Sequence, residues 1–360
     1  MTKDELVGVV HGGDVVDGAS LPEQNLQGAR LSGGIFESCA FPRARLAGAT
    51  FQESVIRNTD LSGADLAGVD LRHTVFQKCS LRGANLAGAN LINTTFAECD
   101  LGEASFEGAT FEMCSVSDGV LDRASFRNTR LHGSMFTKAT YEGTDFSGAT
   151  LSMLVLHEAD LRSAKFVSTV FDLAVLLKVN LAGQDLRSVK MHATQLSDGN
   201  LAECDLSGVF LEKCTLKGVD LRRARLCQAK AMHALFAEAK LAGANLAGAT
   251  IRQCIFVSAD LEDADLTQAD AFQSVFQKAR CVRTRFDGAE LGYADFSYAD
   301  ISGASFEGSK THRTRFHSVT ATDPPTGSRW GSLGDDERLA RAEKQDPYKA
   351  AREKQDSPEG

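Results

Sequence analysis

The sequence predicts a single elongated solenoid, and three observations lead to that prediction. Large apolar residues recur at every fifth position from Leu21 to Phe316, and of these 60 positions 31 are Leu and 19 are Phe. A small residue, most often Ala, stands two positions before nearly every large one, and no insertion or deletion breaks the register. A period of five fits neither an amphipathic helix nor a half-buried strand. Such a chain can bury both apolar positions only by turning every five residues around a narrow axis.

The repeating unit is plainest at residues 64–68, 84–88 and 244–248, which read Ala-Asp-Leu-Ala-Gly or Ala-Asn-Leu-Ala-Gly. This pattern closely resembles that of the pentapeptide-repeat family, A-(D/N)-L-x-x, and the resemblance covers residues 21 to about 320. It implies an all-β fold, namely a right-handed quadrilateral β-helix with four units per coil. Gly after the centre suits the corners of such a coil, because Gly tolerates positive φ.

The number of units per coil can be tested on the sequence, because centres 20 residues apart should then stack on one face. One set of such centres is almost purely Leu, and we call its side the Leu face: Leu61, Leu81, Leu101, Leu121, Leu161, Leu181, Leu201, Leu221, Leu241 and Leu261. Another set defines a Phe-rich face: Phe36, Phe76, Phe96, Phe136, Phe236, Phe256, Phe276, Phe296 and Phe316. We therefore expect about fifteen coils, and a rod roughly 70 Å long at the spacing of stacked strands.

Both ends of a solenoid expose its core and need covering. We expect residues 1–20 to form an N-terminal cap, in which Thr2 and Glu5 make a capping box for a short helix over residues 2–11. Residues 21–319 form the β-helix. Residues 320–360 read as a linker followed by a charged tail that is partly helical or disordered. The single Trp, Trp330, is expected to plug the C-terminal end of the core.

Composition excludes several classes of function. The net charge is −9 and the mean hydropathy −0.18, so a protein that coats nucleic acid is not expected. No run of about 18 uncharged apolar residues is present, so we expect no membrane span. The acidic start, with Asp4 and Glu5 before any apolar run, argues against a secretory signal, and we expect a cytoplasmic protein.

The reactive side chains are explained by the repeat rather than by chemistry. Cys39, Cys79, Cys99, Cys114, Cys204, Cys214 and Cys254 replace Ala at the small position, Cys281 is a centre, and only Cys227 points outward. Buried free thiols suit a reducing compartment. The His residues are too far apart along the rod to converge on one zinc ion. We find no nucleophile–base pair and no phosphate or dinucleotide motif, so we expect no enzyme, no metal and no cofactor.

Outward positions must then carry the function. Directly before the centres of the Phe-rich face, nine of fifteen residues are large and apolar, whereas the 45 such positions on the other faces hold only Ala40, Val120, Val170 and Phe210 as apolar residues. One interpretation is that β-branched ladders simply strengthen this face by packing between coils. The other is an interaction surface, since contiguous exposed apolar area usually marks one. The nine residues are Ile35, Val55, Val75, Met135, Val155, Val175, Leu235, Ile255 and Val275.

The concentration of outward apolar residues is highest near the middle of the rod. We name as the mid-rod patch seven residues that occupy outward positions within 25 residues of sequence: Met153, Val155, Val167, Val170, Leu173, Val175 and Leu177. Leu154 stands at a position meant for Ala, and we expect it to bulge or kink the coil there. The hypothesis is that this patch mediates docking of a protein partner or lateral self-association, as in a homodimer.

The sequence therefore predicts a non-enzymatic protein–protein interaction scaffold of unknown partner. An alternative follows from the resemblance, since the best-understood activity in the family is protection of type II topoisomerases, such as gyrase, by an acidic rod that mimics DNA. A mimic should display an unbroken negative track, whereas a ladder of mixed charge climbs one edge here: Lys78, Glu98, Asp118, Lys138, Glu158, Lys178 and Asp198. A second alternative is a secretion-system adaptor or effector, with the non-repeat tail as the recruiting element.

Overall fold

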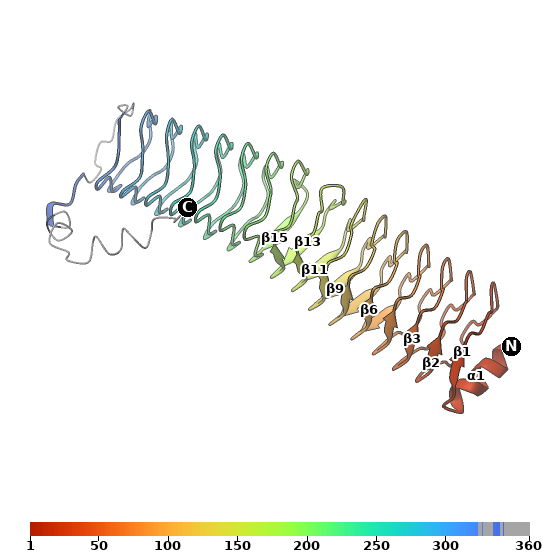
Figure 1. Ribbon diagram of the computed structural model, residues 1–360. Coiled ribbons are helices and arrows are strands. Elements are labelled where there is room, and N and C mark those ends of the chain that lie inside the picture. The colour runs from red at the N-terminus through yellow and green to blue at the C-terminus, as the bar shows by residue number, and fades with distance from the viewer. Residues whose placement is uncertain (323–325, 327–333, 339–340, 342–360) are drawn as a thin grey trace.

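The protein is a long rod made of stacked coils, with a short helix at its N-terminal end (Figure 1). The computed structural model describes residues 1–322, 326, 334–338 and 341. Trp330 and most of the expected charged tail lie outside the described residues. The all-β solenoid predicted from the period of five is confirmed.

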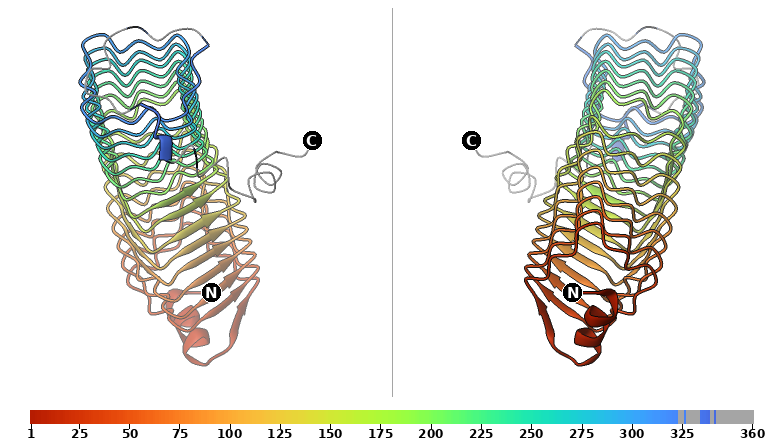
Figure 2. Two further views of the ribbon diagram at one scale, coloured as in Figure 1. Left: turned by 90° about the vertical axis from the view of Figure 1, so that its left-hand side faces the viewer. Right: turned by 90° about the vertical axis from the view of Figure 1, so that its right-hand side faces the viewer.

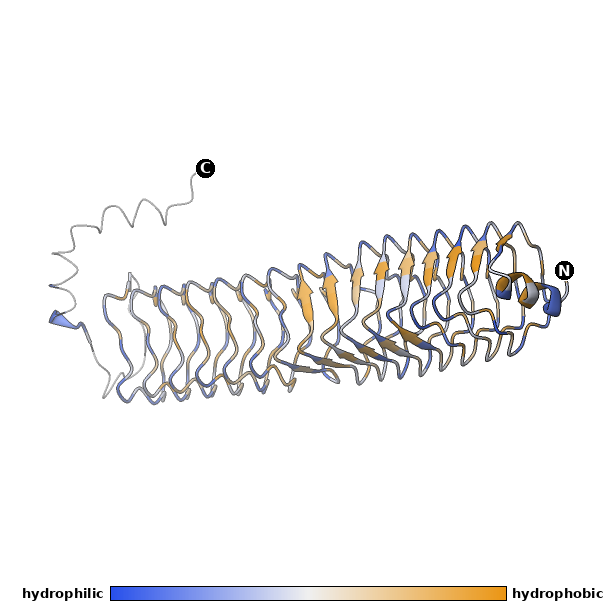
Figure 3. Cartoon of the chain, turned by 90° about the horizontal axis from the view of Figure 1, so that it is seen from below, coloured by the Kyte–Doolittle hydropathy of each residue, from blue (hydrophilic) through white to orange (hydrophobic). Residues whose placement is uncertain are grey.

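The strands are three residues long and form two parallel sheets along different sides of the rod (Figure 3). One sheet has nine strands in the order β1-β2-β3-β4-β6-β8-β10-β12-β14, and the other has six in the order β15-β13-β11-β9-β7-β5. The strand bounds are β1 Val15–Asp17, β2 Ile35–Glu37, β3 Val55–Arg57, β4 Val75–Gln77, β5 Asn90–Ile92, β6 Thr95–Ala97, β7 Thr110–Glu112, β8 Ser115–Ser117, β9 Arg130–His132, β10 Met135–Thr137, β11 Thr150–Ser152, β12 Val155–His157, β13 Val170–Asp172, β14 Val175–Leu177 and β15 Lys190–His192.

Every pairing up to Thr320 joins residues 20 apart, which is the register of four units per coil. Val15 pairs with Ile35 at one end of the nine-stranded sheet, and Val155 pairs with Val175 at the other. Beyond this sheet the same register continues as single bridges as far as Arg315. The longer sheet has nine regular strands, which is fewer than the fifteen or so coils expected. The register itself runs further, because fifteen steps of 20 residues separate Val15 from Arg315. The side views follow this stack along the rod (Figure 2).

Local hydrogen bonds explain why each unit turns. In a typical unit the Ala64 N–H donates to the carbonyl of Leu61 (3.0 Å), which closes the corner, and the Leu61 N–H donates to Ser80 on the next coil (2.7 Å). The Asp60 carboxylate accepts the N–H of Ser62 (2.9 Å). Asp or Asn directly before the centre therefore satisfies a backbone donor at the corner, as such side chains do in turns. At the corner itself Gly63 adopts a φ of +63°, which costs Gly no steric strain.

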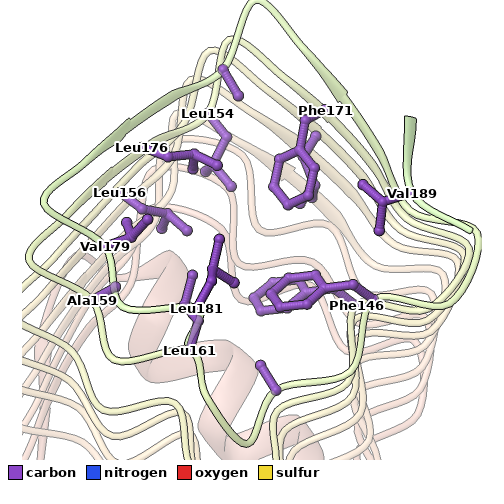
Figure 4. Packing of buried hydrophobic residues seen from close by; sticks show 14 of the residues in the cluster. Phe146, Leu154, Leu156, Ala159, Leu161, Phe171, Leu176, Val179, Leu181 and Val189 are labelled. Carbon is purple, nitrogen blue, oxygen red and sulfur yellow. The ribbon is translucent and has the colours of Figure 1, made fainter. Parts of the chain in front are cut away.

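The interior is filled by four columns of centres, one from each face, and all of them point inward (Figure 4). Besides the Leu face and the Phe-rich face, we name the Phe146 face after the stacked rings of Phe106, Phe126, Phe146 and Phe166. The ring centroids of Phe106 and Phe126 lie 4.9 Å apart. The fourth side carries the six-stranded sheet, whose strands are β5, β7, β9, β11, β13 and β15, and we call it the Phe171 face. Stacking at the coil spacing gives each ring dense contacts above and below.

Polar residues at the small core position are also satisfied. The hydroxyl of Thr129 donates to the carbonyl of Phe106, 23 residues earlier (2.9 Å), and the thiol of Cys204 does the same to Leu181 (2.9 Å). Eight of the nine Cys are buried and Cys227 is half-buried, as the repeat predicted. Burial raises the pKa of Cys204 to about 11 and that of Cys254 to about 12, so these thiols stay protonated at neutral pH.

The predicted N-terminal helix is α1, Lys3–His11. The Thr2 hydroxyl accepts the N–H of Glu5 (3.2 Å) and the Glu5 carboxylate accepts the N–H of Thr2 (2.7 Å), so the capping box is present. Leu6 and Val10 are buried on the side that covers the first coil. The bridge ladder already includes β1 within residues 1–20, and it extends to Thr326, which pairs with Ser305.

Candidate interaction surface

The apolar residues predicted on the Phe-rich face are only partly exposed. Ile35, Val75, Met135 and Ile255 are exposed, and the most exposed of these is Met135 at 49%. Five others are half-buried, since they stack against their neighbours 20 residues away: Val55, Val155, Val175, Leu235 and Val275. Packing between coils therefore accounts for part of this ladder, and the exposed remainder is available for contact.

The mid-rod patch wraps around two faces. Val167 is 61% exposed, Leu173 51% and Met153 48%, while Val155, Val170, Val175 and Leu177 are half-buried. Met153 and Leu173 occupy the same corner on successive coils, between the Phe171 face and the Phe-rich face. Val167 and Val170 lie at the other edge of the Phe171 face. The patch is thus a band along adjoining coils rather than one flat cluster.

Sequence reasoning missed exposed apolar residues on the Phe171 face. Phe210 is 48% exposed, and the Lys230 ammonium lies 4.5 Å from the centre of its ring. An open groove of about 510 Å³ runs beside Phe210, Val170 and Met191. Phe210 stands directly before the centre Leu211, the position already counted, and counting outward apolar residues at all three outward positions of each unit would have found the rest of this set. Its other exposed members are Met113, Met232 and Tyr293.

The bridge ladder has one interruption on the Leu face. On this face single bridges join residues 20 apart, beginning with Ser20 and Ala40 and ending with Asp300 and Thr320. The one pair missing from this series is Thr140 with Asp160. In the neighbouring coils the Leu121 N–H donates to Thr140 (3.0 Å) and the Leu161 N–H to Asn180 (2.8 Å). Across the interruption, no described residue accepts the equivalent N–H of Tyr141. We call the space between residues 138–143 and 158–163 the seam.

A second interruption follows on the Phe146 face, where Lys165 and Asp185 do not pair. Here the chain fills the opening with its own side chain. The Gln184 amide nitrogen donates to the carbonyls of Leu161 (2.9 Å), Arg162 (2.7 Å) and Ala164 (2.9 Å). This explains why Gln184 stands at a core position that usually holds a small residue. Its amide supplies hydrogen bonds to carbonyls of the neighbouring coil where the backbone pairing of Lys165 with Asp185 is missing.

Leu154 does not interrupt the ladder on its own face, so the bulge or kink expected for its coil does not occur at Leu154 itself. Leu154 is fully buried, and β12 pairs in register with both β10 and β14 on either side. The extra volume is accommodated within the interior, where Leu154 points inward beside Leu176 (Figure 4). Both interruptions lie on the other two faces of the same coils.

The seam is open and acidic. It encloses a volume of about 580 Å³, and its lining includes Asp122, Glu142, Glu158 and Asp160. Arg162 also lines it but is bound by Asp160, with 2.7 Å between nitrogen and oxygen. A hydrogen bond from Arg162 holds the pKa of Asp160 below its usual range, so this carboxylate is charged at neutral pH.

Tyr141 lies where the seam meets the core, and it is the one aromatic residue among the centres of the Leu face between residues 61 and 261. Its side chain is 3% exposed, and its hydroxyl is the one buried side-chain oxygen or nitrogen without a hydrogen-bond partner in the described part of the chain. Burial raises the pKa of this hydroxyl, which therefore stays protonated. An unpaired buried hydroxyl costs free energy of folding.

The described residues form neither a metal site nor a membrane span. No group of three or more His, Cys, Asp or Glu side chains there is placed so that it could hold a metal ion. None of the described helices has the length and apolar character needed to cross a bilayer.

Comparison with protein families identifies the repeat. The family model for pentapeptide repeats matches residues 25–63, 39–77, 155–192, 194–230, 232–270 and 273–309, and the model for a pentapeptide repeat region matches residues 89–166. The chain belongs to the pentapeptide-repeat family. A search of curated proteins gave no match for this pentapeptide-repeat protein.

Solved structures similar to this pentapeptide-repeat protein include HetL from the cyanobacterium Nostoc, a protein involved in heterocyst differentiation regulation. It is 26% identical over 75% of this chain and 97% of its own, with a TM-score of 0.29. QnrB1, a plasmid-mediated fluoroquinolone resistance protein, is 16% identical over 54% of this chain and 98% of its own, with a TM-score of 0.40. Because both TM-scores are below 0.5, neither protein's role is transferred to this chain.

We predict that replacing Tyr141 with Phe stabilises this pentapeptide-repeat protein by about 1 kcal/mol, because the change removes the unpaired hydroxyl and keeps the ring. The measurement is urea unfolding followed by circular dichroism. Tyr293→Phe serves as the control, since Tyr293 is 45% exposed, and we expect it to leave the unfolding midpoint unchanged. A lower midpoint for Tyr141→Phe would show that the hydroxyl is bonded in solution and would contradict the prediction.

Proposed function

We propose that this protein is a non-enzymatic, cytoplasmic protein–protein interaction scaffold that docks a partner through the mid-rod patch. The single observation that carries the proposal is the exposure of Met153 and Leu173 at one corner of successive coils. Large apolar side chains that are half exposed on adjoining coils form the kind of surface that proteins bury on association.

Neither residue serves the fold at its position. Both corners require positive φ, and Met153 and Leu173 adopt +53°. Gly or Asn adopts this conformation at lower cost than a large apolar residue does. Most other such corners carry Gly or polar residues, for example Gly63 and Asn58, and the exceptions are Met113, Ala193, Tyr293 and Tyr298. Because their side chains add nothing to the core and little to the turn, binding is the function that explains them.

The partner is either a different protein or a second copy of the chain. We propose the rigid rod as the scaffold and the band of apolar residues as the docking site, with no catalytic group and no cofactor assigned. A secretion-system role would depend on the C-terminal tail, which falls mostly outside the described residues, and no observation on the rod favours it.

Replacing both Met153 and Leu173 with Lys is expected to abolish complex formation, since it places two charges on the surface that the partner buries. Association is measured by light scattering of the purified chain and by capture of partners on the immobilised chain. Thermal unfolding should change little, because both side chains are exposed.

Met113→Lys is the matched control, because Met113 occupies the equivalent corner two coils earlier, with a φ of +55° and 60% exposure. We expect it to associate like the wild type. If the double variant associates as strongly as Met113→Lys does, docking does not use the mid-rod patch.

DNA mimicry is the alternative, and the surface charges are arranged differently from those of a mimic. Acids along the rod are paired within the chain: Asp185 with Arg187 at 2.6 Å and Asp220 with Arg222 at 2.5 Å. In the mixed-charge ladder Lys178 lies 3.3 Å from Glu158. The cationic groups beside these carboxylates interrupt the negative potential that a phosphate-like track would need.

We therefore predict that micromolar amounts of the protein leave the supercoiling activity of gyrase unchanged, with or without a fluoroquinolone. The measurement is a plasmid supercoiling assay with bovine serum albumin at equal mass as the control. Inhibition of supercoiling, or rescue from the drug, would establish the mimic and displace the scaffold proposal.

A further inference from the structure

The seam presents backbone groups that regular coils satisfy with one another. In adjacent coils the N–H of Asn180 donates to Ala159 (2.9 Å) and that of Thr140 donates to Gly119 (3.1 Å). The equivalent N–H of Asp160 has no acceptor among the described residues, and neither has the N–H of Tyr141. The two sides of the seam therefore resemble two strand edges that face each other without pairing, and such edges are templates for another strand.

Some donors in the seam are satisfied locally, which limits what can bind there. The Gly143 N–H donates to the Ser163 hydroxyl (3.1 Å), and the Glu142 N–H donates to the Asp122 carboxylate (2.9 Å). Between Thr140 and Gly143 the N–H left without an acceptor among the described residues is that of Tyr141, and on the facing coil the N–H of Asp160 is left in the same way. A guest needs only a short extended stretch of backbone to reach both.

The second interruption shows what kind of group fits such an opening. There the Gln184 amide, which has the same donor and acceptor chemistry as a peptide group, bonds three carbonyls of the neighbouring coil. The seam is closed by no such side chain among the described residues and encloses about 580 Å³. An amide-bearing backbone is thus the guest that both openings would accept.

The charge of the lining selects among such guests. Asp122, Glu142, Glu158 and Asp160 line the seam. Arg162 is engaged by Asp160 at 2.7 Å and Lys178 by Glu158 at 3.3 Å. Glu142 is exposed and has no ion pair in the described part of the protein. The seam is therefore net negative, and Lys or Arg side chains beside the docked backbone would find acceptors on both walls.

We propose that the seam is a docking slot for an extended, basic segment of a partner protein, which adds a short strand between the two coils. The partner's backbone pairs with the edges at Tyr141 and Asp160, and its basic side chains face the carboxylates, as in β-strand addition. The inference rests on the proposed scaffold function but uses residues outside the mid-rod patch. The Met153 and Leu173 double variant should bind such a segment normally, so the two proposals can fail separately.

The test uses a fluorescein-labelled peptide, acetyl-Lys-Val-Lys-Val-Lys-Val-amide, added to the full chain and followed by fluorescence anisotropy. Two matched peptides serve as controls: one with Glu in place of every Lys, and one with the Val nitrogens methylated to remove backbone donors. We expect the basic peptide alone to bind, more weakly at high salt, and to slow hydrogen exchange at the amides of Tyr141 and Asp160.

Glu142→Lys is expected to weaken binding about tenfold or more, since it reverses an unpaired charge in the slot. Glu112→Lys makes the same charge change on an exposed residue of the Phe171 face and should bind as the wild type does. Equal binding by the two variants, or equal binding by the methylated peptide, would show non-specific attraction and overturn the slot.

Two further results would also overturn the proposal. If the basic peptide leaves the exchange of Tyr141 and Asp160 unchanged, solvent alone occupies the seam. If these amides become protected as the concentration of the free chain is raised, a second copy fills the slot instead of a foreign segment.

Discussion

The backbone register of 20 residues is the constraint on which the rest of the structure depends. A five-residue unit has too little apolar surface to fold by itself, so each coil depends on its backbone hydrogen bonds to the coils on either side. Once the register holds, the centres point inward, and Asp or Asn before them, as at Asp60, Asp65 and Asn85, accepts a backbone N–H at the corner. Column packing, buried thiols and outward surfaces all follow from that one alignment.

Because the register is so regular, a departure from it is informative. The rod carries bridges on all four faces, and the two missing ones fall on adjoining faces of the coils between residues 140 and 185. The chain closes one opening with Gln184 and leaves the other lined by carboxylates. The exposed Met153 and Leu173 belong to the same stretch. Exposed apolar side chains and backbone groups without partners on the next coil therefore occur together in the middle of the rod. A uniform repeat would have neither feature there.

Much of this architecture could be predicted from the sequence, because a strict period translates directly into burial. The helix at residues 3–11, the inward Cys and the 20-residue stacking all follow from local rules. The seam could not be predicted, since Thr140 and Asp160 are ordinary for their positions. Tyr141 and Gln184 were the available signals: one is an aromatic residue in a Leu column, the other a polar residue in a small core position. How two neighbouring coils respond to them depends on packing that no repeat pattern encodes.

Residue-resolved hydrogen exchange of the free protein tests this account most directly. If the ladder is as described, the amides of Leu121 and Leu161 exchange slowly, while those of Tyr141 and Asp160, which lack acceptors on the neighbouring coil, exchange rapidly under the same conditions. Slow exchange at Tyr141 and Asp160, equal to that of Leu121, would mean that the coils pair without a break, and the seam would not exist.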